Sequence, residues 1–147
     1  MNIQSFLSAD NTAIDIRASD KAGLLKDIAA RAASALHLSA DAVAHEIEKR
    51  DELGSTGIGG GVSIPHARFR DVKKPFGLLL RLKHAIEFDA VDGQPVDIVF
   101  LLLLPASSQL DQLNALAAVA RKLRDRDVLR KLRSAASGAE LYQAATE

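Results

Sequence analysis

The sequence predicts an α/β fold, because stretches with helical and strand-like periodicity alternate along its 147 residues. Residues 98 to 104 form an uninterrupted apolar run, which is typical of a strand covered on both faces. Other stretches carry apolar side chains every three or four residues, which is the spacing of one helical face. No linker, internal repeat or low-complexity tract interrupts the pattern, so we expect a single domain over residues 1–147.

The first third of the chain predicts one strand and two helices. Residues 11 to 18 alternate polar and apolar side chains, as expected of a half-buried strand. Ser19 and Ser39 are candidate N-caps, because apolar residues recur at helical spacing after each of them. The second helix should end near Gly54, since glycine is a common helix terminator.

The rest of the chain predicts two long strands and three helices. Residues 76 to 83 place leucines on one face of a strand, and residues 96 to 104 should form the central strand of the sheet. Helices are expected over residues 110 to 123 and around residues 128 to 132. The segment Ser137-Gly-Ala-Glu140 has the form of a capping box, which predicts the start of a last helix.

Composition and charge exclude several classes of protein. The chain has no cysteine, which excludes disulfides, thiolate metal sites and cysteine catalysis. Its 19 basic and 19 acidic residues cancel, which argues against nucleic acid as a partner. Neither a signal peptide nor a membrane-length apolar run is present, so we expect a cytoplasmic protein without membrane insertion. Residues 121 to 133 hold seven basic side chains against two acidic ones, a run that is more often a solvated helical face than a binding patch.

A glycine-rich segment between residues 54 and 63 has the composition of an anion-binding loop. Glycine permits positive φ angles, and successive backbone N–H groups in such turns form concavities that favour anions. Hydroxyls within the segment and an arginine on either side could donate hydrogen bonds to the same anion. We therefore expect a depression lined by residues 54 to 63. The candidate phosphate-binding residues are Arg50, Ser55, Thr56, Gly57, Ser63 and Arg68.

His66 is the candidate reactive residue. Pro65 fixes its own φ and biases Ile64 toward extended geometry, so the segment before His66 predicts a short, stiff strand. No acidic cluster that could hold magnesium accompanies the histidine, which favours an imidazole that itself accepts a phosphoryl group as a nucleophile. The alternative is that the glycine-rich loop is a flexible turn and His66 a solvent-exposed bystander.

Two segments resemble a known protein family. L-G-S-T-G-I-G-G-G-V-S-I-P-H-A-R, residues 53 to 68, resembles the active-site motif of enzyme IIA proteins of the phosphoenolpyruvate-dependent phosphotransferase system, fructose/mannitol type. Residues 86 to 106 are similar to the nitrogen-related branch of that family, and the resemblance covers roughly residues 45 to 125. It implies a mixed five-stranded sheet with helices on both faces, phosphorylation of His66 at Nε2, a supporting role for Arg50, and no metal or cofactor.

The resemblance implies a phosphoryl carrier, a transferase component rather than an enzyme that turns over a small molecule. The expected donor is a histidine-phosphorylated carrier protein, and the expected targets are regulatory partner proteins such as kinases or transporters. Two alternatives stay open: a sugar-transporting enzyme IIA that hands phosphate to a IIB partner, and an interaction module that is never phosphorylated. A serine hydrolase is disfavoured because G-V-S-I-P lacks the second glycine of that motif, and a nucleotide-binding regulator because neither glycine-rich nucleotide motif is present.

The chain departs from the family at one position. Many enzyme IIA proteins place a second histidine in the helix after the central strand, and the corresponding residue here is Gln112. A glutamine amide can donate a hydrogen bond to a phosphate oxygen, but it cannot carry a positive charge or shuttle a proton. We expect Gln112 to lie within side-chain reach of His66 and to assist and orient only.

Overall fold

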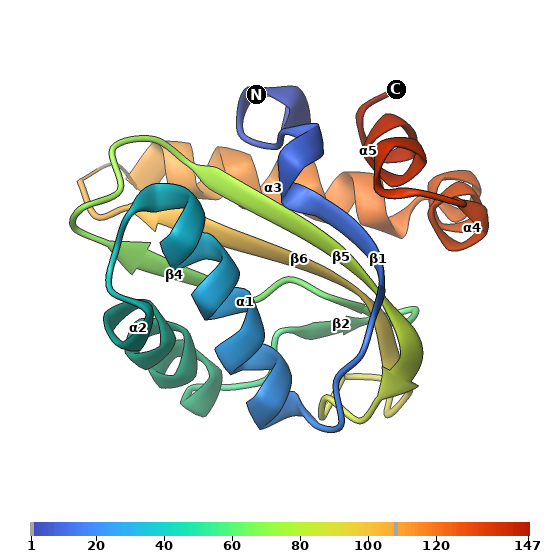
Figure 1. Cartoon of the computed structure of the whole chain (residues 1–147), viewed down its shortest axis with the longest axis horizontal. Coiled ribbons are helices and arrows are strands. Elements are labelled where there is room, and N and C mark those ends of the chain that lie inside the picture. Colours follow the sequence, from blue (N-terminus) through green and yellow to red (C-terminus); the bar gives the residue numbers. More distant parts are fainter. Residues whose placement is uncertain (1, 108) are drawn as a thin grey trace.

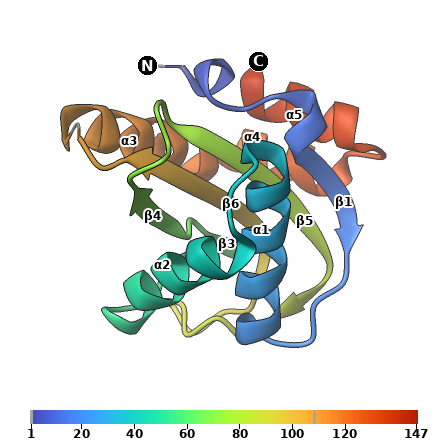
Figure 2. The same cartoon turned by 60° about the vertical axis from the view of Figure 1, so that its left-hand side comes forward.

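The computed structural model describes residues 2–107 and 109–147, and it shows a mixed sheet with helices on both faces (Figure 1). Figures 1 and 2 show α1 and α2 in front of the sheet and α3 behind it, which confirms the predicted α/β fold. The elements are η1 (Ile3–Ser5), η2 (Ala9–Asn11), β1 (Thr12–Ile16), α1 (Lys21–Leu36), α2 (Ala40–Glu52), β2 (Gly57–Gly59), β3 (Val62–Ser63), β4 (His66–Phe69), β5 (Phe76–Ile86), β6 (Val96–Pro105), α3 (Gln109–Arg124), α4 (Arg126–Ser134) and α5 (Gly138–Thr146).

The sheet has six strands within the described residues, in the order β1-β5-β6-β3-β2 with β4 also paired to β6. Strands β1 and β5 are parallel, β5 and β6 are antiparallel, and β3 and β4 both run parallel to β6. Because β3 pairs with the start of β6 and β4 with its end, the two short strands occupy one position, interrupted at Ile64 and Pro65. The sheet therefore has the five expected positions, with one of them divided.

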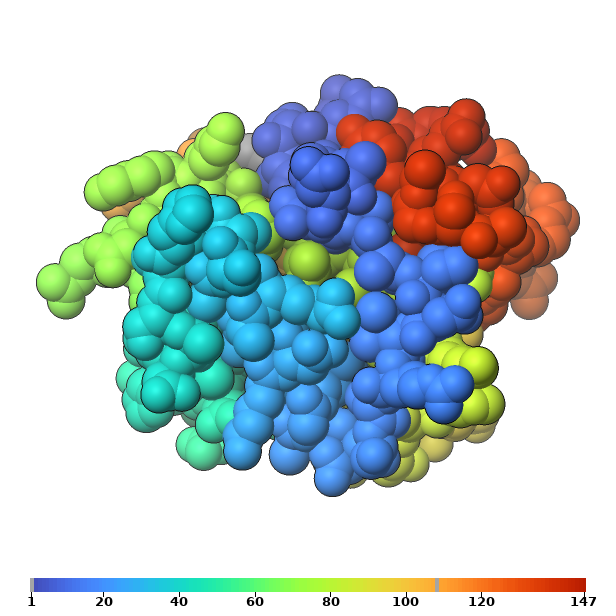
Figure 3. All heavy atoms as spheres, in the orientation of Figure 1, coloured from blue at the N-terminus to red at the C-terminus, as the bar shows by residue number. Residues whose placement is uncertain are grey.

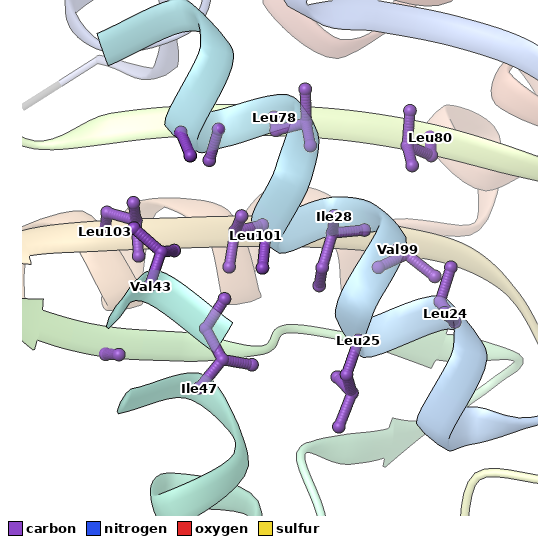
Figure 4. Packing of buried hydrophobic residues seen from close by; sticks show 14 of the residues in the cluster. Leu24, Leu25, Ile28, Val43, Ile47, Leu78, Leu80, Val99, Leu101 and Leu103 are labelled. Carbon is purple, nitrogen blue, oxygen red and sulfur yellow. The ribbon is translucent and has the colours of Figure 1, made fainter. Parts of the chain in front are cut away.

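The uninterrupted apolar sequence of β6 follows from its position, because the strand faces a hydrophobic layer on each side. Val99, Leu101 and Leu103 point toward α1 and α2, where they pack against side chains such as Ile28 and Ile47 (Figure 4). The alternate residues pack on the other face against α3, α4 and α5. Every residue of β6 except Asp97 is buried. The prediction of a central strand covered on both faces is confirmed.

The helix caps follow the sequence at two of the three predicted sites. Ser39 and Ser137 each accept a hydrogen bond from the backbone N–H three residues ahead, at 3.3 and 3.2 Å. At the start of α1, however, the cap is Asp20, whose Oδ1 accepts from the backbone N–H of Gly23 at 2.7 Å. The prediction of Ser19 was wrong, because aspartate caps a helix as well as serine does and is the residue adjacent to the first turn.

The helices cover the sheet closely. In Figure 3, α1, α2 and the N-terminal segment hide almost all of the strands behind them. The longest described helices, α1 and α3, have 16 residues each and bury only one face. Among the described residues, no helix combines the length and the apolar character that crossing a membrane requires.

Candidate functional site

His66 is the first residue of β4, at an open edge of the sheet. Strand β2 pairs with β3 and not with β4, so β4 has a strand neighbour only on its β6 side. The backbone N–H of Leu102 donates to the carbonyl of Pro65 at 2.9 Å, and His66 lies opposite Leu102 in the ladder. In Figures 1 and 2, β4 lies between α2 and α3. The half-buried imidazole is therefore carried by a strand that is fixed immediately before it.

The imidazole of His66 is held in one tautomer. Its Nδ1 lies 2.8 Å from the carbonyl oxygen of Ile64. A carbonyl oxygen can only accept, so Nδ1 carries the proton and donates it, and Nε2 keeps its lone pair. Burial lowers the pKa of His66 from its ordinary value of 6.5, the hydrogen bond to Ile64 opposes this shift, and the positive charge of Arg50 lowers the pKa further. A lowered pKa favours the neutral ring at neutral pH, in which Nε2 carries the free lone pair.

A depression of about 400 Å³ surrounds His66 and spans the edge of the sheet from α2 to α3. Three cationic side chains face one carboxylate in its lining, so the depression attracts anions. We call it the histidine depression. Its lining includes Glu46, Lys49 and Arg50 of α2, Leu53 at the C-cap of α2, His66 and Arg68 of β4, and Gln112, Leu113 and Leu116 of α3.

Arg50 comes from the last turn of α2, close enough to His66 for its charge to affect the imidazole. Its Nη1 donates to the carbonyl oxygen of Gly54 at 2.9 Å, which anchors the guanidinium beside the end of the helix. A guanidinium has five N–H donors in a planar fork, and this bond uses one of them. The remaining donors suit the oxygens of a phosphoryl group.

Gln112 lies in the first turns of α3 and shares the histidine depression with His66. Its side chain is 7% exposed, and its Nε2 donates to the carbonyl oxygen of Pro105 at 2.8 Å. This bond fixes the amide at the end of β6, on the side of the sheet edge that α3 covers. The second hydrogen of the amide nitrogen is left for another acceptor.

The predicted hydroxyl donors and Gly57 do not line the histidine depression. Ser55 donates to the carbonyl of Phe88 at 2.7 Å, and the hydroxyls of Thr56 and Ser63 are buried and 3.2 Å apart. Gly57 packs against Ala90, so closely that a Cβ at Gly57 would lie 2.8 Å from the Ala90 Cα. These contacts hold the segment that leads to His66, while Arg50, Arg68 and Gln112 surround the ring itself.

The expectation that residues 54 to 63 line the depression was wrong. Gly59, Gly60 and Gly61 have φ angles of 99°, 67° and 79°, and they turn the chain into the β2–β3 hairpin. The hairpin runs along the start of β6, whereas β4 and His66 lie along its end. Glycine therefore shapes the turn but does not bring its N–H groups to the histidine.

Several lining residues were missed by the sequence analysis, although their spacing gave a signal. Glu46 and Leu53 lie four residues before and three residues after Arg50, and Leu113 and Leu116 lie one and four residues after Gln112. Residues three or four apart share a helical face. Once Arg50 and Gln112 are assigned to the site, helical geometry predicts three of these neighbours. They are Glu46, Leu53 and Leu116.

The comparisons with known proteins agree with this geometry. Residues 5–147 match the family described as phosphoenolpyruvate-dependent sugar phosphotransferase system, EIIA 2. A nitrogen regulatory protein of Bradyrhizobium diazoefficiens is 42% identical over 127 residues, which cover 86% of this chain and 83% of that protein. That of Escherichia coli K12 is 38% identical over 148 residues, covering 100% of this chain and 91% of the relative.

Solved structures also match this chain. The crystal structure of nitrogen regulatory protein IIA-Ntr from Neisseria meningitidis matches with a TM-score of 0.92 and 30% identity, covering 98% of this chain and 99% of that one. The mannitol IIA of Escherichia coli shares the fold, with a TM-score of 0.78 at 17% identity over 95% of this chain and 98% of that one. The resemblance in the glycine-rich and central-strand segments is confirmed: the chain belongs to the EIIA 2 family of the phosphoenolpyruvate-dependent phosphotransferase system, in the branch of the nitrogen regulatory proteins.

Proposed function

We propose that this protein is a cytoplasmic phosphoryl carrier. It accepts phosphate on Nε2 of His66 from a histidine-phosphorylated carrier protein, and its phosphorylation state decides which partner proteins, such as kinases or transporters, it regulates. The observation that supports this most strongly is the neutral imidazole of His66, with Nδ1–H held by the Ile64 carbonyl and Nε2 in a cation-lined depression. The nitrogen regulatory proteins among its relatives support the regulatory reading over sugar transport.

The transfer itself requires few groups. The Nε2 lone pair of His66 attacks the phosphorus of the donor phosphohistidine, and a new N–P bond forms as the donor N–P bond breaks. The electron pair of the broken bond returns to the donor imidazole. The ring of His66 then bears both the phosphoryl group and the Nδ1 proton, so it is cationic, and the Ile64 carbonyl stabilises that charge. Catalysis of this kind depends on positioning and on charge neutralisation.

Each neighbour of His66 has a proposed role in this transfer. The guanidiniums of Arg50 and Arg68 neutralise the phosphoryl dianion, Arg50 from α2 and Arg68 from the exposed side of β4. Gln112 donates its second amide hydrogen to a phosphoryl oxygen. Ser55, Thr56, Gly57 and Ser63 maintain the lead-in to His66 through their internal contacts.

The rim of the histidine depression supports docking of a protein donor. Leu53 and Leu113 line it and are 83% and 65% exposed, and Leu110 is exposed on the same helix as Leu113. Exposed apolar side chains that gather in one place mark sites of contact with other proteins. The donor's phosphohistidine would enter between α2 and α3.

The proposal is tested by phosphate transfer from phosphoenolpyruvate through purified upstream proteins, with nitrogen-type and sugar-type carriers compared as donors. We expect acid-labile, alkali-stable label on the wild-type protein, none on His66→Gln, and normal labelling of His84→Gln, since His84 is exposed and outside the depression. Label that persists in His66→Gln would overturn the assignment. Faster labelling by the sugar-type carrier would favour the sugar-transporting alternative.

A further inference from the structure

A second basic depression lies between the β2–β3 hairpin and the junction of α3 with α4, and it shares no residue with the histidine depression. Its volume is about 540 Å³. Two features of the sequence that are unrelated along the chain, the glycine-rich turn and the basic run of residues 121 to 133, meet there. We call it the arginine pocket. Its walls include Ile58 and Leu129 and the side chains of Arg124, Arg126, Arg130 and Arg133.

The arginine pocket concentrates positive charge in a chain whose formal net charge is zero. No carboxylate of residues 2–107 or 109–147 lines it. Arg130 and Arg133 are paired with aspartates outside the lining, Asp127 and Asp97. Arg124 and Arg126 are exposed, and their side chains make no hydrogen bond or ion pair with any described residue. Two permanently charged guanidiniums at the mouth of one depression thus have no partner among the described residues.

The wall of the pocket is fixed before any ligand arrives. Arg133 binds Asp97 through two bonds, Nε to Oδ2 at 3.0 Å and Nη2 to Oδ1 at 2.9 Å, and Nη2 also donates to the carbonyl of Gly60 at 2.7 Å. From the other side, the Gly60 N–H donates to Asp92 at 3.0 Å. A Cβ at Gly61 would lie 2.5 Å from Arg133 Nη2 and 2.9 Å from Asp97 Oδ1, so any larger residue there would displace this ion pair.

The chemistry of the pocket points to a ligand with both apolar and phosphate parts. Ile58 and Leu129 are half-buried and give it an apolar floor, while the free guanidiniums at the mouth suit bidentate bonds to phosphate. Its volume lies in the range of small-molecule sites. We propose that the arginine pocket binds a nucleotide, with the nucleoside against Ile58 and Leu129 and the phosphates against Arg124 and Arg126. Glycine-rich nucleotide motifs are not needed for this mode, because side chains hold the phosphates.

Binding is measured by isothermal titration of the whole chain at physiological salt, with ATP, inorganic triphosphate and adenosine as probes. We expect ATP to bind with one-to-one stoichiometry and more tightly than either fragment. The double variant Arg124→Gln/Arg126→Gln should bind ATP about tenfold more weakly or worse, because each lost guanidinium removes charge-assisted hydrogen bonds. The double variant should melt at the wild-type temperature, since neither side chain has a partner in the part of the chain that the structure describes.

Three further variants serve as controls for this proposal. Arg17→Gln/Arg121→Gln removes the same charge from exposed positions outside the pocket and should bind ATP as the wild type does. Ile58→Ala should weaken the binding of ATP and leave the affinity for inorganic triphosphate unchanged. His66→Gln should bind ATP normally, so failure of the carrier proposal and failure of this one are distinguishable.

The proposal is overturned if the wild type does not bind ATP, or if the control double variant loses as much affinity as Arg124→Gln/Arg126→Gln. Triphosphate that binds as tightly as ATP would show a site for simple polyanions, which contradicts the role of the apolar floor. A glutamate-rich peptide that binds more tightly than ATP would instead show an interaction surface for an acidic protein segment.

Discussion

The histidine depression and the arginine pocket lie at opposite ends of α3, and both are lined by cationic side chains. Gln112 contributes to the first from the early turns of the helix, and Arg124 contributes to the second from its last residue. The histidine depression combines its cations with a half-buried imidazole of fixed tautomer, whereas the arginine pocket has four guanidiniums and no nucleophile in its lining. We therefore expect both regions to bind anions, but only the histidine depression to accept a phosphoryl group, because only its lining holds a nucleophilic imidazole.

After His66 itself, Arg50 should have the largest effect on the rate of phosphate transfer. Replacing Arg50 with Gln removes charge-assisted hydrogen bonds to the phosphoryl group, worth about 1.5–3 kcal/mol, so transfer should slow roughly ten- to hundredfold. Arg50→Lys keeps the charge but loses the planar fork, so its transfer rate should lie between those of Arg50→Gln and the wild type. Rapid-quench measurement of phosphate transfer gives the rates.

The melting temperature of both Arg50 variants should stay near that of the wild type. Arg17→Gln, which removes an exposed charge far from the depression in sequence and outside its lining, serves as the control and should transfer normally. A large loss of stability with a normal transfer rate would assign Arg50 a structural role at the end of α2 instead.

At the arginine pocket, the corresponding test measures the free energy of unfolding. Gly61→Ala should destabilise the fold by about 1–3 kcal/mol, because alanine at its φ of 79° is strained and its Cβ meets Arg133 and Asp97. Gly60→Ala is the matched control: its φ of 67° imposes the same kind of strain, but nothing lies within 4 Å of an added Cβ. We expect Gly60→Ala to destabilise the fold by about 1 kcal/mol.

Urea unfolding measures both glycine variants, and phosphate transfer to His66 should be unaffected in the folded fraction of each. Equal destabilisation by the two substitutions would show that the packing of Arg133 against the hairpin contributes little. A selective loss of transfer in Gly61→Ala would couple the two regions, which their separate linings do not predict.

The pH dependence of transfer should reflect the environment of His66. Burial and the Arg50 charge lower its pKa below 6.5, so the acceptor should remain active as pH falls to 6.5 and lose activity only below it. The unfolded chain binds this proton more readily than the folded one. His66 therefore contributes stability that is fully present above pH 6.5 and declines as pH falls through the folded-state pKa.

Substitution of one charge tests the cause of this shift. Arg50→Gln should raise the pKa of His66, because it removes a positive charge that disfavours the protonated ring. Arg68→Gln should change that pKa less, since Arg68 lines the same depression but is not among the charges that shift it. Titration of the His66 ring protons by NMR measures both variants, and a larger rise in Arg68→Gln would contradict the assignment.

The two regions also show what the sequence could predict. The helices, the central strand and the stiff lead-in to His66 follow from periodicity and from Pro65, because these are local properties of the chain. The direction of the glycine hairpin does not, because positive φ angles permit a turn without specifying which neighbour it meets. The convergence of Arg124 and Arg126 with Ile58 depends on how α3 and α4 pack on the sheet, so the basic run could not be distinguished from a solvated face.

Gln112 should have the smallest effect, since it supports a transfer that His66 and Arg50 largely determine. Its Nε2 already donates to the carbonyl of Pro105, so only its second hydrogen can assist the phosphoryl group. Gln112→Ala should slow transfer by about threefold to tenfold, the range expected for one neutral hydrogen bond of about 0.5–1.5 kcal/mol. Gln112→His should remain competent, because an imidazole also offers a ring N–H.

Gln112→Glu separates hydrogen-bond donation from shape, because a carboxylate matches the amide in size but only accepts. Facing both the Pro105 carbonyl and the phosphoryl oxygens, the carboxylate would repel the acceptors that the amide satisfies, so Gln112→Glu should transfer more slowly than Gln112→Ala. Asn114→Asp is the matched control, since it introduces the same charge on an exposed part of α3 outside the depression. Transfer abolished by Gln112→Ala, or Gln112→Glu as fast as the wild type, would show that Gln112 acts through something other than a donated hydrogen bond.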